Sequence, residues 1–247
     1  MTAMTTPGST SAATGAATAA ASGLPRHLDA GLPAPPRADA WWRRAAAVAF
    51  GAWLRVDAEG AHHVPATGGV LIAASHASHA DSPTLGLAID RPLSFLGDEK
   101  LQSWPIIGRH FPTMGLVPVD RGRADLDALG HLAALLELGH AVVVFPEGSR
   151  TRDGAVHRPR SGVARLAAAT GVPVVPVGLD GTAAAWPVDG RPRLGRPGVR
   201  VRIGAPMIAP ADNPADRRRF AAELHDHLVA LSGRPRADTF ASIGAPR

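Results

Sequence analysis

The sequence predicts an α/β fold with a largely parallel mixed sheet flanked by helices, on the strength of three observations. Short apolar runs rich in Val, Ile and Leu alternate along the chain with longer segments in which apolar residues recur at helical spacing. Two of the helical segments end at a glycine directly before the next apolar run, at Gly139 and Gly171. The chain has 247 residues, 45% of them hydrophobic, which suits one domain with a substantial core.

The first 36 residues are predicted to be a disordered tail. Residues 9–23 contain only Ser, Thr, Ala and Gly and therefore offer no apolar face to bury, and a Pro-rich link follows them. A basic segment followed by an apolar segment, which would mark a secretory signal, is absent from residues 1–30. No targeting segment is therefore expected.

Residues 37–56 are predicted to be an amphipathic helix. Trp42 and Trp53 share one side at helical spacing, and Arg43 and Arg44 lie towards another. The apolar stretch is too short to cross a bilayer, which takes about 20 residues. Two interpretations stay open: a short membrane-interfacial helical segment that precedes the α/β domain, or a helix whose tryptophans pack on that domain.

Residues 57–232 are predicted to be the α/β domain itself. Its strands are expected at residues 70–75, 93–97, 115–120, 141–144, 172–179 and 198–206. Its helices are expected at residues 81–89, 124–139, 162–171 and 214–231. Asp81 or Ser82 is expected to cap the first of these helices. In the last helix, the residues expected to face inward are Phe220, Leu224, Leu228 and Leu231. Residues 233–247 are expected to be a flexible C-terminal tail.

The composition excludes some chemistry and favours anionic partners. The chain has no cysteine, so disulfides and thiolate–metal sites are excluded. Its formal net charge is +5, which favours phospholipid surfaces, nucleotides or acidic carrier proteins as partners. Nucleic acid is not expected as a partner, because aromatic residues make up only 4% of the chain and no recognition motif is present.

The segment SHASHADSP, residues 75–83, follows an apolar run and carries two histidines and an aspartate. The spacing H-x2-H-x-D of His76, His79 and Asp81 differs from the i, i+4 histidine pair of helical zinc proteases, so no metal site is expected. His76 and Asp81 can meet only if the histidine lies in a strand-to-helix loop and the aspartate at the helix start, because five residues of one helix turn two side chains apart. A carboxylate placed there can fix the imidazole tautomer and leave Nε2 as a general base. The alternative is an N-cap aspartate beside a solvated loop histidine.

Two further segments carry cations at the ends of expected strands. In FPEGSR, residues 145–150, a glycine permits close approach to a ligand, and Arg150 with Arg152 nearby offers planar guanidinium groups suited to phosphate. In GLVPVDR, residues 115–121, Arg121 is another cation. The chain has no serine nucleophile elbow, no Walker A loop and no G-x-G-x-x-G motif. A His–Asp pair in such a chain most simply activates a substrate hydroxyl or water.

Together, SHASHAD, GLVPVDR, FPEGSR and VPVVPV resemble, in their order and approximate spacing, the four motif blocks of the glycerolipid acyltransferase family, whose best-known members are 1-acylglycerol-3-phosphate acyltransferases. The resemblance covers roughly residues 57–206. It implies that His76 is the catalytic base, that Asp81 is its orienting carboxylate and that His79, at a variable position, is not catalytic. It also implies that VPVVPV, residues 172–177, shapes the donor or acyl pocket. The residues that it assigns to the acceptor's phosphate and hydroxyl region are Arg121, Glu147, Gly148, Ser149 and Arg150.

The resemblance implies an enzyme that moves a fatty acyl group from an acyl thioester to the free hydroxyl of a lysophospholipid, without a covalent enzyme intermediate. The expected acceptor is 1-acylglycerol-3-phosphate, which would give phosphatidic acid. The expected donor, acyl-CoA or acyl-carrier protein, is a co-substrate, and neither a cofactor nor a metal is implied. The expected location is peripheral, on an anionic surface at the cytoplasmic face of the cell membrane. A hydrolase that activates water with the same pair, and a non-catalytic membrane-binding scaffold, stay open as alternatives.

Three features depart from the family pattern. Ser75 stands where an asparagine usually precedes the first histidine. Asp98 stands where members often carry a lysine, and Lys100 is displaced by two positions. The basic segment after the third block is RPRSG, residues 158–162, with arginine in place of lysine. These departures concern the identity of the acceptor and leave acyl transfer as the expected reaction.

Overall fold

Seven strands form one sheet in this computed structural model, which describes residues 40–98, 116–119 and 125–242. The strands lie in the order β1-β7-β6-β2-β5-β3-β4, and every neighbouring pair is parallel except β6 with β7. Their bounds are β1 Arg55–Glu59, β2 Val70–Ala74, β3 Leu93–Asp98, β4 Leu116–Val119, β5 Ala141–Val144, β6 Val174–Asp180 and β7 Gly198–Ile203. The predicted α/β class with a largely parallel mixed sheet is confirmed.

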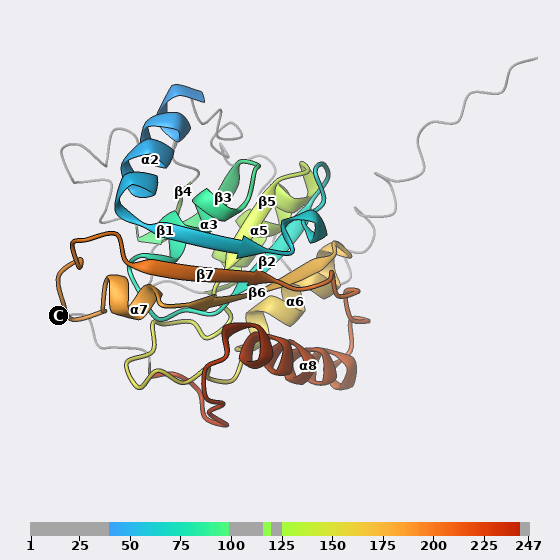
Figure 1. Cartoon of the computed structure of the whole chain (residues 1–247). Helices are drawn as coiled ribbons and strands as arrows, with labels where there is room; N and C mark the ends of the chain where they lie inside the picture. The colour runs from blue at the N-terminus through green and yellow to red at the C-terminus, as the bar shows by residue number, and fades with distance from the viewer. Residues whose placement is uncertain (1–39, 99–115, 120–124, 243–247) are drawn as a thin grey trace, which may run out of the picture.

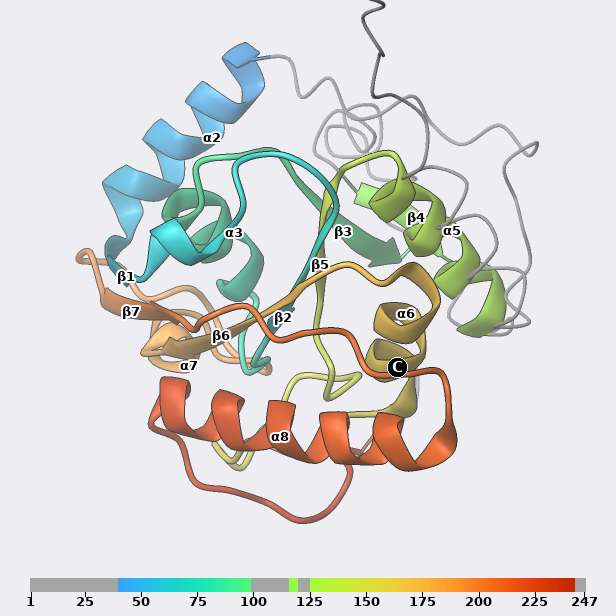
Figure 2. The same cartoon turned by 90° about the vertical axis from the view of Figure 1, so that its right-hand side faces the viewer.

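Helices cover both faces of this sheet (Figures 1 and 2). Their bounds are α2 Ala40–Trp53, α3 Asp81–Ala88, α5 Asp125–Glu137, α6 Ser161–Thr170, α7 Thr182–Ala185 and α8 Pro214–Ser232, with a short 3-10 turn at Ala61–His63. In Figure 2, α2 and α3 lie on one side of the strands, and α5 and α6 lie on the other. Helix α8 packs against α6 and β6 and belongs to the α5–α6 side.

Strand β2 lies in the middle of the sheet with both faces covered, and its sequence, VLIAA, is accordingly apolar at every position. Leu71 and Ala73 point into the core shared with α5, α6 and α8. Val70, Ile72 and Ala74 point into the core shared with α3. Because both faces are covered, both sets of alternating side chains are fully buried. Strand β5 pairs in parallel with β2, so the carboxyl ends of the two strands, and the loops that follow them, meet at one edge of the sheet.

The structure corrects the prediction of one helix over residues 37–56. Helix α2 ends at Trp53, and the chain continues at Arg55 as β1, which is paired in parallel with β7. This strand lies at the edge of the sheet, so its side chains are mostly exposed and give no apolar run. The indole Nε1 of Trp53 donates to the carbonyl of Arg193 at 2.8 Å, and its ring contacts that of Trp186 at 5.9 Å between centroids. This end of α2 therefore packs on the domain.

The remaining predictions for the N-terminal part fall largely outside the described residues. Residues 1–36, the predicted tail, lie outside them, as do the side chains of Trp42 and Arg43 in the predicted amphipathic helix. Among the helices of the described ranges, none is long and apolar enough to span a bilayer.

The VPVVPV segment contributes three valines to the core. Most of it lies in the buried strand β6. Val174 packs in the core on the α5–α6–α8 face, and Val175 and Val177 pack in the core on the α3 face. The three valine side chains are fully buried. These valines pack on both faces of the sheet because β6 is a central strand covered on both sides.

The C-terminal residues 233–242 differ from the predicted flexible tail. Phe220, Leu224 and Leu228 of α8 are buried as predicted, whereas Leu231 is half-buried. The helix ends at Gly233, whose φ of 68° turns the chain out of the helix. Residues 233–242, which we call the strap, then follow a defined path along residues 149–160, held by hydrogen bonds. The sequence of the strap is polar, so its order depends on these distant partners.

Candidate active site

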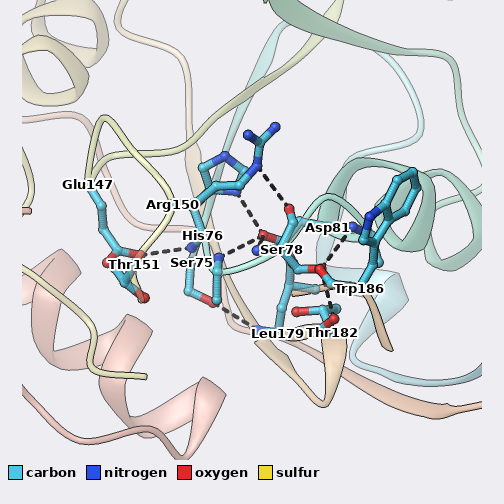
Figure 3. Close-up of polar contacts among 12 residues, drawn as sticks. Ser75, His76, Ser78, Asp81, Glu147, Arg150, Thr151, Leu179, Thr182 and Trp186 are labelled. Carbon is cyan, nitrogen blue, oxygen red and sulfur yellow. Dashed lines mark hydrogen bonds and ion pairs between the residues drawn. The ribbon is translucent and has the colours of Figure 1, made fainter. Parts of the chain in front are cut away.

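The side chains of His76 and Asp81 are joined, as the sequence predicts. The Nδ1 atom of His76 lies 2.8 Å from Oδ2 of Asp81 (Figure 3). His76 lies in the loop after β2, and Asp81 is the first residue of α3. The Asp81 side chain is fully buried, whereas 12% of the His76 side chain is exposed. Because an ionised carboxylate only accepts hydrogen bonds, this contact places a proton on Nδ1 and makes Nε2 the nitrogen able to accept one.

Asp81 also organises the loop that carries the histidine. Its Oδ2 accepts hydrogen bonds from the backbone N–H groups of Ala77 at 2.8 Å and Ser78 at 2.9 Å. The predicted role of Asp81 or Ser82 as the helix cap is corrected: the N-cap position is Ala80, which has no side-chain cap. The carboxylate of Asp81 instead turns back into the preceding loop, where it meets the imidazole and two backbone donors at once.

Two serines fix this loop to the rest of the sheet (Figure 3). The hydroxyl of Ser75 accepts a hydrogen bond from the backbone N–H of Leu179 at 3.0 Å. The hydroxyl of Ser78 lies 2.8 Å from the carbonyl of Thr182 and 2.6 Å from that of Trp186, and its single proton can serve one of them at a time. Both serines are buried. Ser75 thus has a scaffolding role, because its hydroxyl joins the start of this loop to β6.

The loop after β5 meets His76 from the opposite side. The ring of Phe145 stacks on the imidazole with 3.7 Å between centroids and 13° between the planes. The Oε1 atom of Glu147 accepts the backbone N–H of His76 at 2.8 Å, and Oε2 accepts the backbone N–H of His157 at 2.9 Å. The Glu147 side chain is fully buried. The prediction placed Glu147 among substrate-binding residues, whereas both of its oxygens are used to hold the protein's own backbone.

The pKa of Glu147 lies above its usual value because burial disfavours the charged carboxylate. The two backbone hydrogen bonds, from His157 and His76, oppose that rise, and so do the charges of Arg234 and His157. Glu147 is therefore a carboxylate that depends on its donors to remain ionised.

The rest of the EGSR segment is tightly constrained. Gly148 has φ of 79°, and a Cβ atom there would lie 2.7 Å from Cδ and Nε of Arg160. The hydroxyl of Ser149 donates to the carbonyl of Ser242 in the strap at 2.9 Å. The guanidinium of Arg150 reaches towards the His76 loop, where its Nε donates to the carbonyl of Ser78 at 3.3 Å (Figure 3). Gly148 and Ser149 therefore shape the loop, and Arg150 places a cation beside the His–Asp pair.

A pocket of about 310 Å³ is lined by Ala77, the residue after His76, and by Thr151, whose backbone N–H donates to the carbonyl of His76. Pro187 also lines it. Arg152 and Asp189 also line it and form an exposed ion pair with 2.7 Å between Nε and Oδ2. The pocket therefore combines apolar lining residues with an exposed ion pair, and Ala77 and Thr151 connect it to the backbone of His76.

Arg121 lies outside the described residues, as does Lys100. His79 points away from Asp81: its Nε2 lies 3.1 Å from the carbonyl of Val188, and its ring contacts Trp186. In the part of the chain that the structure describes, no group of His, Asp or Glu side chains is arranged to hold a metal ion.

Two residues that the sequence does not signal, His157 and Arg234, also support the site. The backbone N–H of His157 donates to Glu147, and the side chain of Arg234 donates to Thr151 and Ala155. No local pattern signals these contacts, because each joins segments that are distant in the sequence or depends on the fold of a loop.

The chain is similar to known acyltransferases. A family model described as acyltransferase matches residues 55–180. The chloroplastic 1-acyl-sn-glycerol-3-phosphate acyltransferase BAT2 of Brassica napus is 32% identical over 189 residues, which cover 75% of this chain and 55% of that protein. The lyso-ornithine lipid O-acyltransferase of Pseudomonas aeruginosa is 30% identical over 148 residues, which cover 60% of this chain and 55% of that protein.

One solved structure shares the fold. The crystal structure of the 1-acyl-sn-glycerophosphate (LPA) acyltransferase PlsC from Thermotoga maritima aligns with a TM-score of 0.64 at 23% identity, covering 89% of this chain and 86% of that chain. The chain spans about half the length of the first curated relatives it matches, 55%, 46% and 50% in three cases.

Proposed function

The chain belongs to the acyltransferase family, and from this premise we propose that it transfers a fatty acyl group from an acyl thioester to the free hydroxyl of a lysophospholipid. The proposed acceptor is 1-acylglycerol-3-phosphate, and the product is then phosphatidic acid. Relatives named as acyltransferases for this acceptor support the choice. The observation that carries the reaction is the His76–Asp81 pair, held in a strand-to-helix loop whose Ala77 lines an open pocket.

In the proposed reaction His76 acts as a general base. Its Nε2 takes the proton of the acceptor hydroxyl while that oxygen attacks the carbonyl carbon of the thioester. The new C–O bond forms, the C–S bond breaks, and the imidazolium returns the proton to the departing thiolate. Asp81, hydrogen-bonded to Nδ1, stabilises the imidazolium in between. General-base help of this kind is worth ~10²–10⁴-fold in rate.

For the acceptor's phosphate, the proposal assigns Arg150, with Arg152 at the rim of the pocket as a second cation. Arg121 is proposed as a third from its place in the family pattern. A guanidinium is suited to this task because its planar donors match two phosphate oxygens at once. The exposed ion pair between Arg152 and Asp189 is weak enough for a phosphate to compete with the carboxylate.

The proposed donor is acyl-CoA or acyl-carrier protein as a co-substrate, without a cofactor. The proposed location is peripheral, at the cytoplasmic face of the cell membrane, because the acceptor is a lipid. The net charge of +5 supports an anionic surface as a partner, and Val48 of α2 is 72% exposed. Sedimentation with vesicles of anionic lipid, and with vesicles of neutral lipid only, tests this. Replacement of Val48 by glutamate is expected to weaken binding, and equal binding of the two proteins would exclude α2 as the contact.

The experiment that tests the reaction is thiol release from a long-chain acyl-CoA, with and without 1-acylglycerol-3-phosphate, with the lipid product identified by mass spectrometry. Acceptor-dependent release is expected, and it should be lost in His76→Ala and retained in His79→Ala. Equal release without acceptor would replace the proposal with a hydrolase that activates water. Release that depends on lyso-ornithine lipid instead would keep the acyl transfer and change the acceptor. If acyl-CoA gives no thiol release with either acceptor, the assay is repeated with an acyl-carrier protein as donor. No release with that donor either would favour a non-catalytic membrane-binding scaffold.

A further inference from the structure

We propose that Arg234, near the start of the strap, is a positioning residue for His76 and acts through the loop that the strap contacts. The inference rests on the proposed function, because it assigns a role in the same reaction. The loop that follows β5, residues 145–160, connects the strap to the His76 loop. This loop carries Glu147 and Arg150, and it contacts the His76 loop through a buried carboxylate.

The strap lies along this loop and makes a parallel bridge to it, with Arg236 opposite Val156. The backbone N–H of Val156 donates to the carbonyl of Pro235 at 2.8 Å, and the carbonyl of Val156 accepts from Ala237 at 2.9 Å. Two residues further on, the N–H of Arg158 donates to the carbonyl of Thr239 at 3.0 Å. Contacts at every second residue are the pattern of paired extended chains, so the strap supports the loop in the way that a neighbouring strand supports an edge.

The contacts continue to the segment that carries Glu147. The guanidinium of Arg160 donates to the carbonyl of Ala241 at 2.7 Å, while its side chain lies against Gly148. The ring of Phe240 lies under this guanidinium, with 5.6 Å from Cζ to the ring centroid. The carbonyl of Ser242 accepts from Ser149 at 2.9 Å. The last described residues of the chain therefore fix the EGSR segment.

Arg234 makes the shortest connection between the strap and the catalytic histidine. Its Nε donates to the carbonyl of Gly154 at 2.9 Å. Its Nη2 donates to Oγ1 of Thr151 at 2.5 Å and to the carbonyl of Ala155 at 2.7 Å. Thr151 lines the pocket, and its own backbone N–H donates to the carbonyl of His76 at 3.0 Å. One residue thus separates the guanidinium from the backbone of the histidine.

A second connection is electrostatic. The positive charge of Arg234 lowers the pKa of Glu147 and so opposes the rise caused by burial, and the other side-chain charge that acts in the same direction is that of His157. An ionised Glu147 accepts both backbone N–H groups, including that of His76. The Nη1 atom of Arg234 is buried without a partner among the described residues, which costs free energy. Because the buried Nη1 atom of Arg234 costs free energy, the arginine is better explained by its role in holding the loop than by a net contribution to the stability of the fold.

The test compares Arg234→Met, Arg234→Lys and the control Arg236→Gln in the full chain. Arg236 lies on the same strap, but its side chain pairs with Asp226 and Asp238 at the surface. Arg234→Met is expected to lower kcat roughly 10- to 100-fold with little change in the KM for either substrate, because the base is misplaced while the substrate contacts remain. Arg234→Lys keeps the charge and should recover part of the loss. Arg236→Gln should match the wild type.

A readout independent of turnover accompanies the kinetics. The imidazole NMR signals of His76, assigned by their absence in His76→Ala, are expected to shift in Arg234→Met and to stay unchanged in Arg236→Gln. If the wild-type protein has no acyltransferase activity, the proposed function fails, and these signals still decide the role of Arg234. Unchanged His76 signals in Arg234→Met would overturn the inference. A loss of kcat that only follows the fraction of unfolded protein, with no recovery in Arg234→Lys, would overturn it as well.

Discussion

The carboxylate of Glu147 accepts a hydrogen bond from the backbone N–H of His76 at 2.8 Å, although 71 residues separate the two in the chain. The same carboxylate holds the N–H of His157, so it joins the loop after β2 to two parts of the loop after β5. A fully buried carboxylate is tolerated here because both oxygens have donors. The imidazole is consequently fixed twice, through its ring by Asp81 and through its backbone by Glu147.

Replacement of Glu147 by glutamine is predicted to lower both stability and activity. Only one side-chain oxygen then remains, so either the N–H of His76 or that of His157 loses its acceptor. An unsatisfied buried donor costs about 1–3 kcal/mol, which chemical unfolding measures. We expect kcat to fall more than tenfold, since a misplaced base can cost about 10²-fold. Wild-type kcat in a stably folded Glu147→Gln variant would contradict the positioning role.

The same residue predicts opposite pH trends for stability and activity. Because burial raises the pKa of Glu147, the folded state binds its proton more tightly than the unfolded state. Its contribution to stability is present below the unfolded pKa, about 4.3, and is lost as pH rises through the folded value. The free energy of unfolding of the wild type should therefore fall with rising pH relative to that of Glu147→Gln. Activity of the wild type should rise over the same window, because the ionised form holds both N–H groups. Parallel stability curves for the two proteins would contradict the assignment.

Replacement of Asp81 by asparagine is predicted to lower kcat by ~10²–10⁴-fold. A neutral amide cannot stabilise the imidazolium, and it no longer fixes the proton on Nδ1 of His76. The control is His79→Ala, because His79 contacts the carbonyl of Val188 and not the pair. Steady-state kinetics of the acyl transfer measures kcat for both variants. Equal losses of kcat in Asp81→Asn and His79→Ala would indicate damage to the loop and not the loss of the carboxylate that pairs with His76.

The His–Asp pair could be predicted from the sequence because its determinants are local. An apolar run, a short loop and a helix start lie within residues 70–83, and their order alone brings His76 to Asp81. Strands such as β2 and β5 could be predicted for a similar reason, since a covered parallel strand reads as a continuous apolar run.

The features that escaped prediction depend on distant partners. Strand β1, with the sequence RVDAE, has no apolar run that would signal a strand. It lies at the sheet edge, where its side chains are mostly exposed, and the backbone makes its pairing with β7. The strap contains one proline and no apolar period, so the sequence alone predicts a tail, and the order of residues 233–242 depends on contacts with residues 149–160. Glu147 looks like a ligand for substrate until its burial is known.

Replacement of Arg150 by lysine is predicted to weaken binding of the acceptor and to leave kcat largely unchanged. A lysine keeps the charge but cannot present two parallel donors to a phosphate. The loss of a charge-assisted hydrogen bond is worth about 1.5–3 kcal/mol, so the KM for 1-acylglycerol-3-phosphate should rise roughly 10- to 100-fold. Arg165→Lys, on an exposed turn of α6, serves as the control. A fall in kcat at unchanged KM would assign Arg150 to the chemical step instead.

Alanine substitutions at Gly148 and Gly171 distinguish the cost of backbone strain from the cost of crowding. Gly148 and Gly171 both have a left-handed backbone, with φ of 79° and 67°. Alanine at either position carries the same conformational cost, roughly 1–2 kcal/mol. At Gly171, the C-cap of α6, the added methyl group meets no atom within 4 Å. At Gly148 it lies 2.7 Å from the side chain of Arg160, which must move.

That movement would break the contact between the Arg160 guanidinium and the carbonyl of Ala241, which holds the strap to the loop. Gly148→Ala should therefore lose more stability than Gly171→Ala, by about 0.5–1.5 kcal/mol for one hydrogen bond. It should also lose kcat, because the residue adjoins Glu147, whereas Gly171→Ala should lose stability alone. Chemical unfolding and kinetics of the two variants measure these differences. Equal stability losses and equal kcat values would mean that the Arg160 side chain moves aside freely and that its contact with the strap does not hold the loop.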